Sequence, residues 1–174
     1  MNKDNKMNMA GNALLVASSG GHLQEMLRFK NVIHEYAIAL VTEKTDIEPG
    51  PIGLPIKYVP QTNRKELLFP LKFLYLCVYS ILTVLKLRPV YIITTGALIA
   101  VPFCIFGKML GKKIIFIETF ARIHSLSLSG KLIYPIADCF IVQWDELINQ
   151  YPKALYGGIS LDISVCRNTK ISDE

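Results

Sequence analysis

The sequence lacks the short motifs that mark the best-known nucleotide-binding, metal and hydrolase sites. It has no Walker A loop, no GxGxxG fingerprint, no HExxH pair and no Ser/His/Asp spacing typical of a hydrolase. Paired cysteines are also missing, because no CxxC pair occurs among the four cysteines, Cys77, Cys104, Cys139 and Cys166. This spacing predicts neither a zinc site nor a disulfide framework, and it fits a reducing, cytosolic compartment. We therefore expect no bound metal ion and no organic cofactor.

Two further absences concern the start and the middle of the chain. The first apolar run, residues 13–17, is too short for the hydrophobic part of a signal peptide, so none is expected. Acidic residues are scarce between Lys57 and Lys113, where nine basic residues and one acid, Glu66, give a net charge of +8. This basic, apolar middle favours an anionic surface as a partner, with an ordinary solvated helix face as the alternative. No nucleic acid partner is expected.

The composition and the order of short runs predict the fold class. The 174 residues are 51% hydrophobic with a mean hydropathy of +0.34, enough for one domain with a sizeable core. The expected strands are 13–18, 36–42, 56–59, 90–94, 113–117 and 139–142, and the expected helices are 22–33, 67–87, 101–110, 128–137 and 145–151. This alternation predicts an α/β fold, a Rossmann-like doubly wound parallel sheet. The domain is expected over 12–160, between a flexible N-terminus (1–11) and a polar tail (161–174).

The helix expected over 67–87 carries unusually few charges. Thirteen residues from Phe73 to Leu85 carry no charge. This run is too short to cross a bilayer, because a spanning helix needs about 20 apolar residues. The polar side chains form one narrow stripe: Lys72, Tyr75, Tyr79, Thr83 and Lys86. Two interpretations stay open, a well-buried crossover helix or a helix that also lies in a membrane interface. For the second, the expected membrane contacts are Lys72, Phe73, Leu74, Lys86 and Arg88, peripherally on the cytoplasmic face of the plasma membrane.

Three loops follow strands at the expected carboxyl edge of the sheet, where open α/β folds bind ligands. The first, residues 18–22, reads Ser-Ser-Gly-Gly-His directly before a helix. Glycines let the backbone approach a ligand, and the free N–H groups of a helix start favour a phosphate or diphosphate. A side chain at Gly21 is expected to fill the space that the phosphates need and to resist a positive φ. His22 is expected to contact the diphosphate or transfer a proton, with a histidine packed on the helix as the alternative.

The other two loops add hydroxyl groups and a charge pair. Residues 94–97 read Thr-Thr-Gly-Ala, small side chains that leave room for a ligand and can bond phosphate oxygens. The third loop contains Glu118 and Arg122; Glu118 is expected to orient His22 or contact a ligand hydroxyl, or alternatively to pin the loop. The candidate binding residues are therefore Ser18, Ser19, Gly20, Gly21, His22, Thr95, Gly96 and Arg122, and the candidate catalytic residues are His22 and Glu118.

Several motifs in a fixed order resemble one family. They are SSGGHL at 18–23, TTGA at 94–97, AVP at 100–102, GKxxG at 107–111, IExFxR at 117–122, GKLxYP at 130–135 and FIVQW at 140–144. These motifs resemble the bacterial capsule and exopolysaccharide proteins, some labelled PssD-like, that are counterparts of the membrane-anchored subunit of the two-subunit dolichol-diphosphate N-acetylglucosamine transferase. The resemblance covers residues 11–159.

The resemblance implies a fold and a role. It implies the N-terminal, acceptor-binding half of a GT-B glycosyltransferase, similar to the peptidoglycan enzyme that adds N-acetylglucosamine to lipid I. It also implies a lipid-diphosphate-linked acceptor and a separate partner chain, similar to the C-terminal half, that supplies the UDP-sugar pocket. Two other hypotheses stay open: a self-sufficient transferase or nucleotide-binding enzyme, and a membrane scaffold that never contacts the acceptor.

Overall fold

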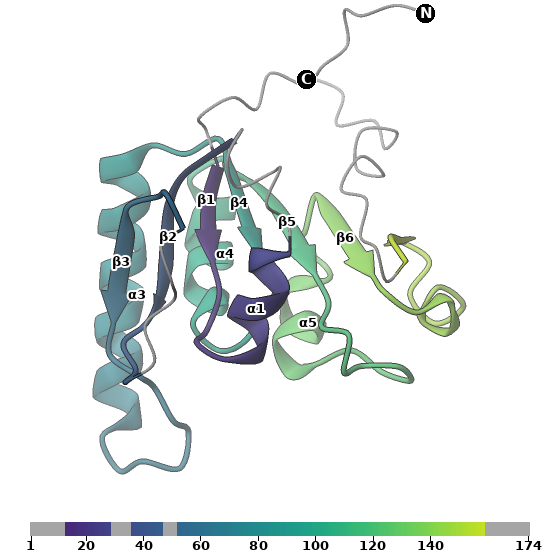
Figure 1. Cartoon of the computed structure of the whole chain (residues 1–174), viewed down its shortest axis with the longest axis horizontal. Helices are drawn as coiled ribbons and strands as arrows, with labels where there is room; N and C mark the ends of the chain where they lie inside the picture. Colours follow the sequence, from purple (N-terminus) through teal and green to yellow (C-terminus); the bar gives the residue numbers. More distant parts are fainter. Residues whose placement is uncertain (1–12, 29–35, 47–51, 159–174) are drawn as a thin grey trace, which may run out of the picture.

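The protein is built on a seven-stranded parallel β-sheet flanked by helices (Figure 1). The computed structural model describes residues 13–28, 36–46 and 52–158. In chain order the elements are β1 (Ala13–Val16), α1 (Gly21–Leu27), β2 (Ala37–Glu43), β3 (Ile56–Val59), α3 (Phe69–Leu87), β4 (Tyr91–Thr94), α4 (Ala100–Met109), β5 (Lys113–Ile117), α5 (Leu128–Ile133), β6 (Cys139–Val142), the 3₁₀ turn η1 (Asp145–Leu147) and β7 (Ala154–Tyr156).

The strand order, β3-β2-β1-β4-β5-β6-β7, contains one reversal. The chain first builds outward from β1 to β2 and β3, and then starts again on the other side of β1 with β4. The two central strands pair in parallel from Ala13 opposite Tyr91 to Val16 opposite Thr94. In doubly wound sheets, ligands bind outside the carboxyl ends of the strands at such a switch point. A ligand site is therefore expected at the loops that follow β1 and β4.

Alternate strand residues supply two separate core layers, one on each face of the sheet. Ile92 and Ile114 pack with side chains of α3, α4 and α5. Their chain neighbours Ile93 and Ile115 point the other way and pack with α1. Figure 1 shows the same arrangement, with α1 in front of the sheet and α3 and α4 behind it. Because both faces are covered, the central strands are apolar throughout, as the sequence predicted.

All six predicted strands are present, and the predicted fold class is confirmed. The edge strand β7 was missed, because three residues are too few to show a strand pattern. The helices expected over 128–137 and 145–151 are shorter, since α5 ends at Ile133 and the second is only the turn η1. The expected flexible N-terminus, 1–11, and polar tail, 161–174, lie outside the described residues.

The cysteines differ from the expectation in one respect. Cys77 and Cys104 are free thiols, but Cys139 at the start of β6 is disulfide-bonded. The wide spacing of the cysteines did not indicate this bond, because a disulfide depends on distance in the fold rather than along the chain.

Candidate functional site

The turn after β1 holds one glycine in a backbone conformation that other residues avoid. Gly20 has φ 84° and ψ −135° and directly precedes α1. Gly21 is already the first helical residue, so the demand for a positive φ falls on Gly20 and the expectation for Gly21 is corrected. A Cβ built at Gly21 meets no atom of the described residues within 4 Å. The space in front of Gly21 is therefore open to a ligand.

His22 is held by the loop that follows β4. Its Nδ1 lies 2.8 Å from the carbonyl oxygen of Thr95, and the Thr95 hydroxyl donates to the His22 carbonyl at 2.7 Å. Because a carbonyl can only accept, Nδ1 carries the hydrogen and Nε2 of the neutral ring keeps its lone pair. Gly96, at φ 101°, lies against the ring, since a Cβ there is placed 3.7 Å from His22 Cε1 and 3.2 Å from Phe116 Cζ. Thr95 and Gly96 thus position His22.

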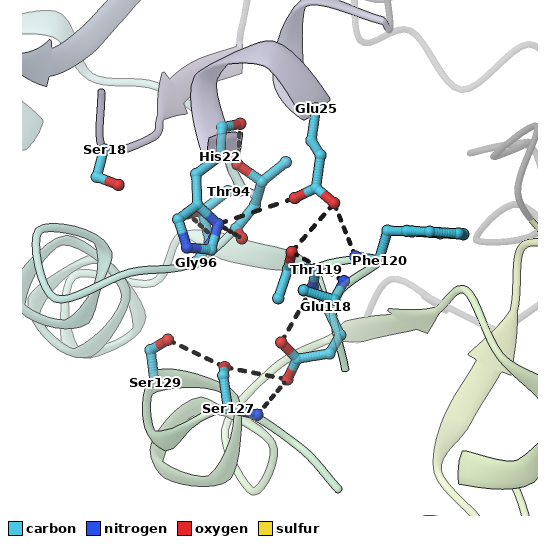
Figure 2. A network of polar contacts seen from close by, with 12 residues as sticks. Ser18, His22, Glu25, Thr94, Gly96, Glu118, Thr119, Phe120, Ser127 and Ser129 are labelled. Carbon is cyan, nitrogen blue, oxygen red and sulfur yellow. Dashed lines mark hydrogen bonds and ion pairs between the residues drawn. The ribbon is translucent and has the colours of Figure 1, made fainter. Parts of the chain in front are cut away.

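Glu25, one helical turn after His22, joins α1 to the loop after β5 (Figure 2). Its Oε1 accepts hydrogen bonds from the backbone N–H of Phe120 at 2.7 Å and from the Thr119 hydroxyl at 3.1 Å. Its Oε2 is buried, has no hydrogen-bond partner among the described residues and lies 3.9 Å from His22 Nδ1. The sequence analysis did not single out Glu25, although His22, Glu25 and Arg28 share the three-residue spacing of one helix face.

Glu118 is a loop-fixing residue in this structure. It is only 1% exposed, and its Oε2 accepts bonds from the backbone N–H of Ser127 at 3.0 Å and from the Ser127 hydroxyl at 3.1 Å. Its Oε1 accepts from the Thr119 N–H at 3.0 Å. Burial raises the pKa of the Glu118 carboxyl, while these hydrogen bonds and the charge of Arg122 act in the opposite direction. A Cβ at Gly130 collides with Oε2, so glycine is required there for this contact.

The loop formed by residues 118–127 is also held from β6. Trp144 donates its indole N–H to the Phe120 carbonyl at 2.7 Å, and the two rings lie 4.9 Å apart. Gln143 donates to the Glu118 carbonyl at 2.9 Å. Side chains from α1 and from the segment after β6 therefore fix this loop, which is the arrangement expected where a loop has to present groups in one geometry.

A cavity of about 550 Å³ lies between α1 and the 118–127 loop, within the size range of small-molecule sites. Its lining residues are Gly21, His22, Gln24, Glu25, Arg28, Thr119, Phe120, Ala121, Arg122 and Ser127. Two of them, Arg28 and Arg122, are guanidinium groups, whose planar N–H pairs suit phosphate oxygens. The lining combines these cations with an imidazole, a carboxylate and hydroxyl groups, which can bind the phosphate and hydroxyl groups of one ligand.

Only part of the predicted site reaches this cavity. Gly21, His22 and Arg122 line it, whereas Thr95 and Gly96 lie behind His22. The remaining predicted residues are not among the lining residues: Ser18, Ser19, Gly20 and Glu118. Two of the predicted loops, those after β1 and β5, therefore reach the cavity, while the lining residues Gln24, Glu25 and Arg28 were not predicted.

A second buried carboxylate, Glu43, lies at the carboxyl end of β2 outside the cavity lining. Its Oε1 accepts the backbone N–H of Thr62 at 3.2 Å. Burial raises the pKa of the Glu43 carboxyl, opposed by hydrogen bonds from the Thr62 and Ser19 backbones and by the charge that His22 can carry. Glu43 thus connects the loop after β3 to the turn after β1.

The outer side of α3 is apolar. The helix has 19 residues and is long and apolar enough to cross a membrane by length and composition, which corrects the estimate from the uncharged run alone. Ser80 and Thr83 are buried against the core, whereas two members of the expected polar stripe, Tyr75 and Lys86, are exposed. Five apolar side chains at helical spacing are also exposed, and we call them the apolar face of α3: Leu71 (66% exposed), Leu74 (61%), Val78 (50%), Leu82 (60%) and Leu85 (52%).

The expected membrane contacts flank or belong to this face. Leu74 is part of it, and Phe73 is half-buried and stacks on Phe69. Lys72 pairs with Glu66 near the N-terminal end of the helix. The other two predicted contacts, Lys86 and Arg88, are exposed at its C-terminal end. The interpretation of α3 as a well-buried crossover helix is therefore wrong, because one long side of it is open.

Two other basic residues of the middle segment have a structural role. Lys108 Nζ lies 2.7 Å from Asp138 Oδ1, and Lys113 Nζ lies 3.8 Å from the same atom. The other oxygen of Asp138 accepts the Ile114 N–H at 2.8 Å. Part of the positive charge counted in the sequence is therefore matched within the fold, and less of it is available to an anionic partner.

Comparison with known proteins identifies the family. The model of the family described as "Oligosaccharide biosynthesis protein Alg14 like" matches residues 63–160, more than half of the chain. The chain belongs to the Alg14 family. It is 31% identical over 166 residues to the UDP-N-acetylglucosamine transferase subunit ALG14 of Candida albicans, covering 83% of this chain and 76% of that protein. The human protein of the same name is 29% identical over 174 residues, with 83% and 81% covered.

Solved structures of other proteins show the same fold. MurG of Acinetobacter baumannii superimposes with a TM-score of 0.63 at 14% identity, covering 78% of this chain and 42% of that chain. The MnaA–UDP structure from S. aureus gives 0.66 at 10% identity, covering 86% and 44%. At such low identity these matches establish the fold alone, a Rossmann-like domain of the GT-B type. The chain spans less than half of either protein.

Proposed function

We propose that this chain is the acceptor-binding, membrane-associated subunit of a two-component glycosyltransferase. The complete enzyme transfers a sugar from a UDP-sugar to an acceptor linked to a lipid through a diphosphate. The family description and the naming of the relatives as UDP-N-acetylglucosamine transferase subunits support a sugar-transfer role. The motifs shared with bacterial PssD-like proteins support a place in capsule or exopolysaccharide synthesis.

The cavity beside α1 is the observation that carries this proposal. Arg28 and Arg122 come from different elements and line the same space, into which the bare backbone of Gly21 opens. A diphosphate fits this set, because two guanidinium groups bind its oxygens in pairs and a glycine leaves room for them. His22 lines the same cavity and is the group available for a sugar hydroxyl.

His22 is the proposed base of the reaction. The acceptor hydroxyl oxygen forms a bond to the anomeric carbon of the donor sugar, and the bond from that carbon to the phosphate oxygen of UDP breaks. UDP leaves with the electron pair, and the hydroxyl proton passes to His22 Nε2, since Nδ1 already donates to the Thr95 carbonyl. In this proposal Glu118 acts by fixing the 118–127 loop and does not contact the acceptor.

The apolar face of α3 is the proposed contact with the membrane. A helix that lies in the interface buries leucine side chains among the acyl chains and keeps lysine and arginine at the headgroups. Leu71, Leu74 and Leu82 supply the first group, and Lys86 and Arg88 supply the second. A lipid-linked acceptor is confined to the membrane, and the UDP-sugar is cytosolic, so we place the chain peripherally on the cytoplasmic face of the plasma membrane.

A donor-binding chain is the proposed partner. The relatives are named as UDP-N-acetylglucosamine transferase subunits, which supports a second chain that carries the UDP-sugar site. The carboxyl edge of the sheet, with the cavity, is the side that such a partner covers. We therefore expect little transfer by this chain alone.

Reconstitution tests the proposed function. The chain is mixed with a candidate donor-binding partner, UDP-N-acetylglucosamine and a synthetic lipid-diphosphate sugar, and transfer is compared with that of each chain alone. Only the mixture is expected to be active; robust transfer by this chain alone contradicts the two-component proposal and favours a self-sufficient enzyme.

Arg122 tests the acceptor site within the same assay. Arg122→Ala removes a charge-assisted hydrogen-bond donor worth roughly 1.5–3 kcal/mol, so the acceptor KM is expected to rise about 10- to 100-fold with little change in the donor KM. Lys153→Ala, which removes an exposed cation just before β7 at the opposite edge of the sheet, is the matched control. Equal acceptor KM values for both variants contradict the assignment of the cavity.

A further inference from the structure

We propose that Glu25 is a positioning residue that holds His22 and the 118–127 loop in one arrangement and provides the negative partner for His22 when the ring takes up the acceptor proton. This inference rests on the proposed function and adds to it a residue that neither the sequence motifs nor the family assignment singled out. Glu25 acts through His22 and does not itself contact the acceptor.

The two oxygens of the Glu25 carboxylate have different surroundings (Figure 2). Oε1 takes both hydrogen bonds, from the Phe120 N–H at 2.7 Å and the Thr119 hydroxyl at 3.1 Å. Oε2 takes none and is buried, which is unfavourable for a charged oxygen. Because Oε1 fixes the plane of the carboxylate against the loop, Oε2 is held toward His22, with 3.9 Å between Oε2 and Nδ1. The neighbour of Glu25 Oε2 is therefore His22, the proposed base.

The surroundings of His22 explain why a carboxylate is useful here. The Thr95 carbonyl already sets the tautomer by accepting from Nδ1 at 2.8 Å, so Glu25 is not needed for that. When Nε2 takes a proton the ring becomes a cation, in a cavity that Arg28 and Arg122 also line. Two arginines oppose a further positive charge, and a carboxylate 3.9 Å from the ring offsets this effect. Carbonyl and carboxylate thus divide the tasks that a single aspartate performs in a Ser-His-Asp triad.

The chemistry of the side chain allows the two roles of Glu25 to be separated. In Glu25→Gln, the amide oxygen can replace Oε1 and keep both hydrogen bonds to the loop, while the NH₂ group replaces the negative Oε2. In Glu25→Ala, both the loop contacts and the charge are lost. The matched control is Glu146→Gln, the same change at an exposed glutamate in η1.

The first measurement uses the isolated chain. In ¹H–¹⁵N spectra, the Phe120 amide resonance reports its bond to Glu25 Oε1. We expect this resonance to stay near its wild-type position in Glu25→Gln and to move in Glu25→Ala. A Phe120 resonance that moves equally in both variants, or in neither, overturns the loop-holding part of the inference.

The second measurement uses the reconstituted two-chain enzyme. We expect Glu25→Gln to lower kcat about 10-fold with an unchanged acceptor KM, less than the 10²–10⁴-fold expected when the base itself is removed in His22→Ala. Glu146→Gln is expected to match the wild type. A wild-type kcat for Glu25→Gln beside an impaired Glu25→Ala means that Glu25 only holds the loop, and it overturns the electrostatic part.

A double-mutant cycle shows whether Glu25 acts through His22. The variant His22→Ala/Glu25→Gln is expected to be no slower than His22→Ala, because the charge has no ring left to stabilise. An additional 10-fold loss in the double variant overturns the inference. A fully active His22→Ala instead contradicts the proposed base, so failure of the proposed function and failure of this inference give different results.

Discussion

The cavity beside α1 and the apolar face of α3 differ in where their polar side chains lie. Around the cavity, carboxylates accept hydrogen bonds from hydroxyl and backbone N–H groups of the 118–127 loop, as Glu25 and Glu118 do. On α3, the polar side chains Ser80 and Thr83 are turned into the core, while Leu74 and Leu82 are 61% and 60% exposed. At the cavity, hydrogen bonds fix the polar groups in one geometry. On α3, the apolar face makes no directional contacts within the described part of the chain.

The difference matches two different tasks. Directional bonds hold the proposed proton-transfer and phosphate-binding groups in one arrangement, as a reaction requires. Apolar burial has no preferred direction, so an apolar helix face suits a fluid surface such as a membrane. Figure 1 shows the N-terminal end of α3 and the turn after β1 at the same end of the sheet. In the proposed function, a membrane against α3 holds the lipid-linked acceptor near the end of the sheet where the cavity lies.

The largest effect is expected from filling the cavity without disturbing the fold. Gly21→Val places two methyl groups where a Cβ meets no described atom within 4 Å, so the fold tolerates them but a diphosphate does not. Transfer by the reconstituted enzyme is expected to fall at least about 10²-fold, with a melting temperature close to that of the wild type.

Gly20→Ala provides the contrasting variant one residue earlier. At φ 84° and ψ −135° an alanine is strained, so this variant is expected to lose about 1–3 kcal/mol of unfolding free energy. Thermal unfolding measures the melting temperature of Gly21→Val, and urea unfolding measures the loss of stability in Gly20→Ala.

A fully active Gly21→Val shows that the ligand does not use the space in front of Gly21, and it removes the basis for the proposed phosphate position.

The apolar face of α3 is tested by adding charge to it. Leu74→Glu/Leu82→Glu is expected to weaken binding to vesicles of phosphatidylcholine and phosphatidylglycerol at least about 10-fold, because two apolar contacts are lost and two anions approach anionic headgroups. Vesicle co-sedimentation of the isolated chain measures this. Leu132→Glu, at a leucine that is 58% exposed on α5, is the control and is expected to bind normally. Equal weakening by the control indicates that the membrane does not select α3.

The fold followed from the sequence because the dominant signal was local. Continuous apolar runs such as residues 114–117 predict strands buried on both faces, and helical runs between them require parallel pairing. The direction in which α3 faces was not predictable in this way. Its sequence is apolar nearly all round, so periodicity could not decide which side packs, and Thr83 of the expected polar stripe is buried. Packing against α4 and the sheet made that choice.

The candidate site was predictable only to the level of its loops. Glycine-rich and hydroxyl-rich segments after strands identified the turn at Gly20 and the segment around Thr95. The roles of single side chains depended on contacts between distant segments. Glu118 is an isolated acid in the sequence, and only the fold shows that Ser127 occupies its carboxylate. Glu25 is an ordinary residue of an amphipathic helix until the loop after β5 is brought against it.

The smallest effect is expected at Glu43, a buried carboxylate outside the cavity lining, and it concerns the pH dependence of stability. Burial raises the pKa of the Glu43 carboxyl above its ordinary value of 4.5, so the folded chain holds this proton more tightly than the unfolded chain does. The stability contributed by the protonated form is therefore present below the unfolded pKa and is lost as the pH rises through the folded pKa.

Glu43→Gln keeps an acceptor for the Thr62 N–H and cannot ionise. Relative to the wild type, its unfolding free energy in urea is expected to increase between about pH 5 and about pH 7.5. The exposed Glu146→Gln is expected to show no such trend, and a pH-independent difference for Glu43→Gln means that the Glu43 carboxylate is already fully compensated by its hydrogen bonds.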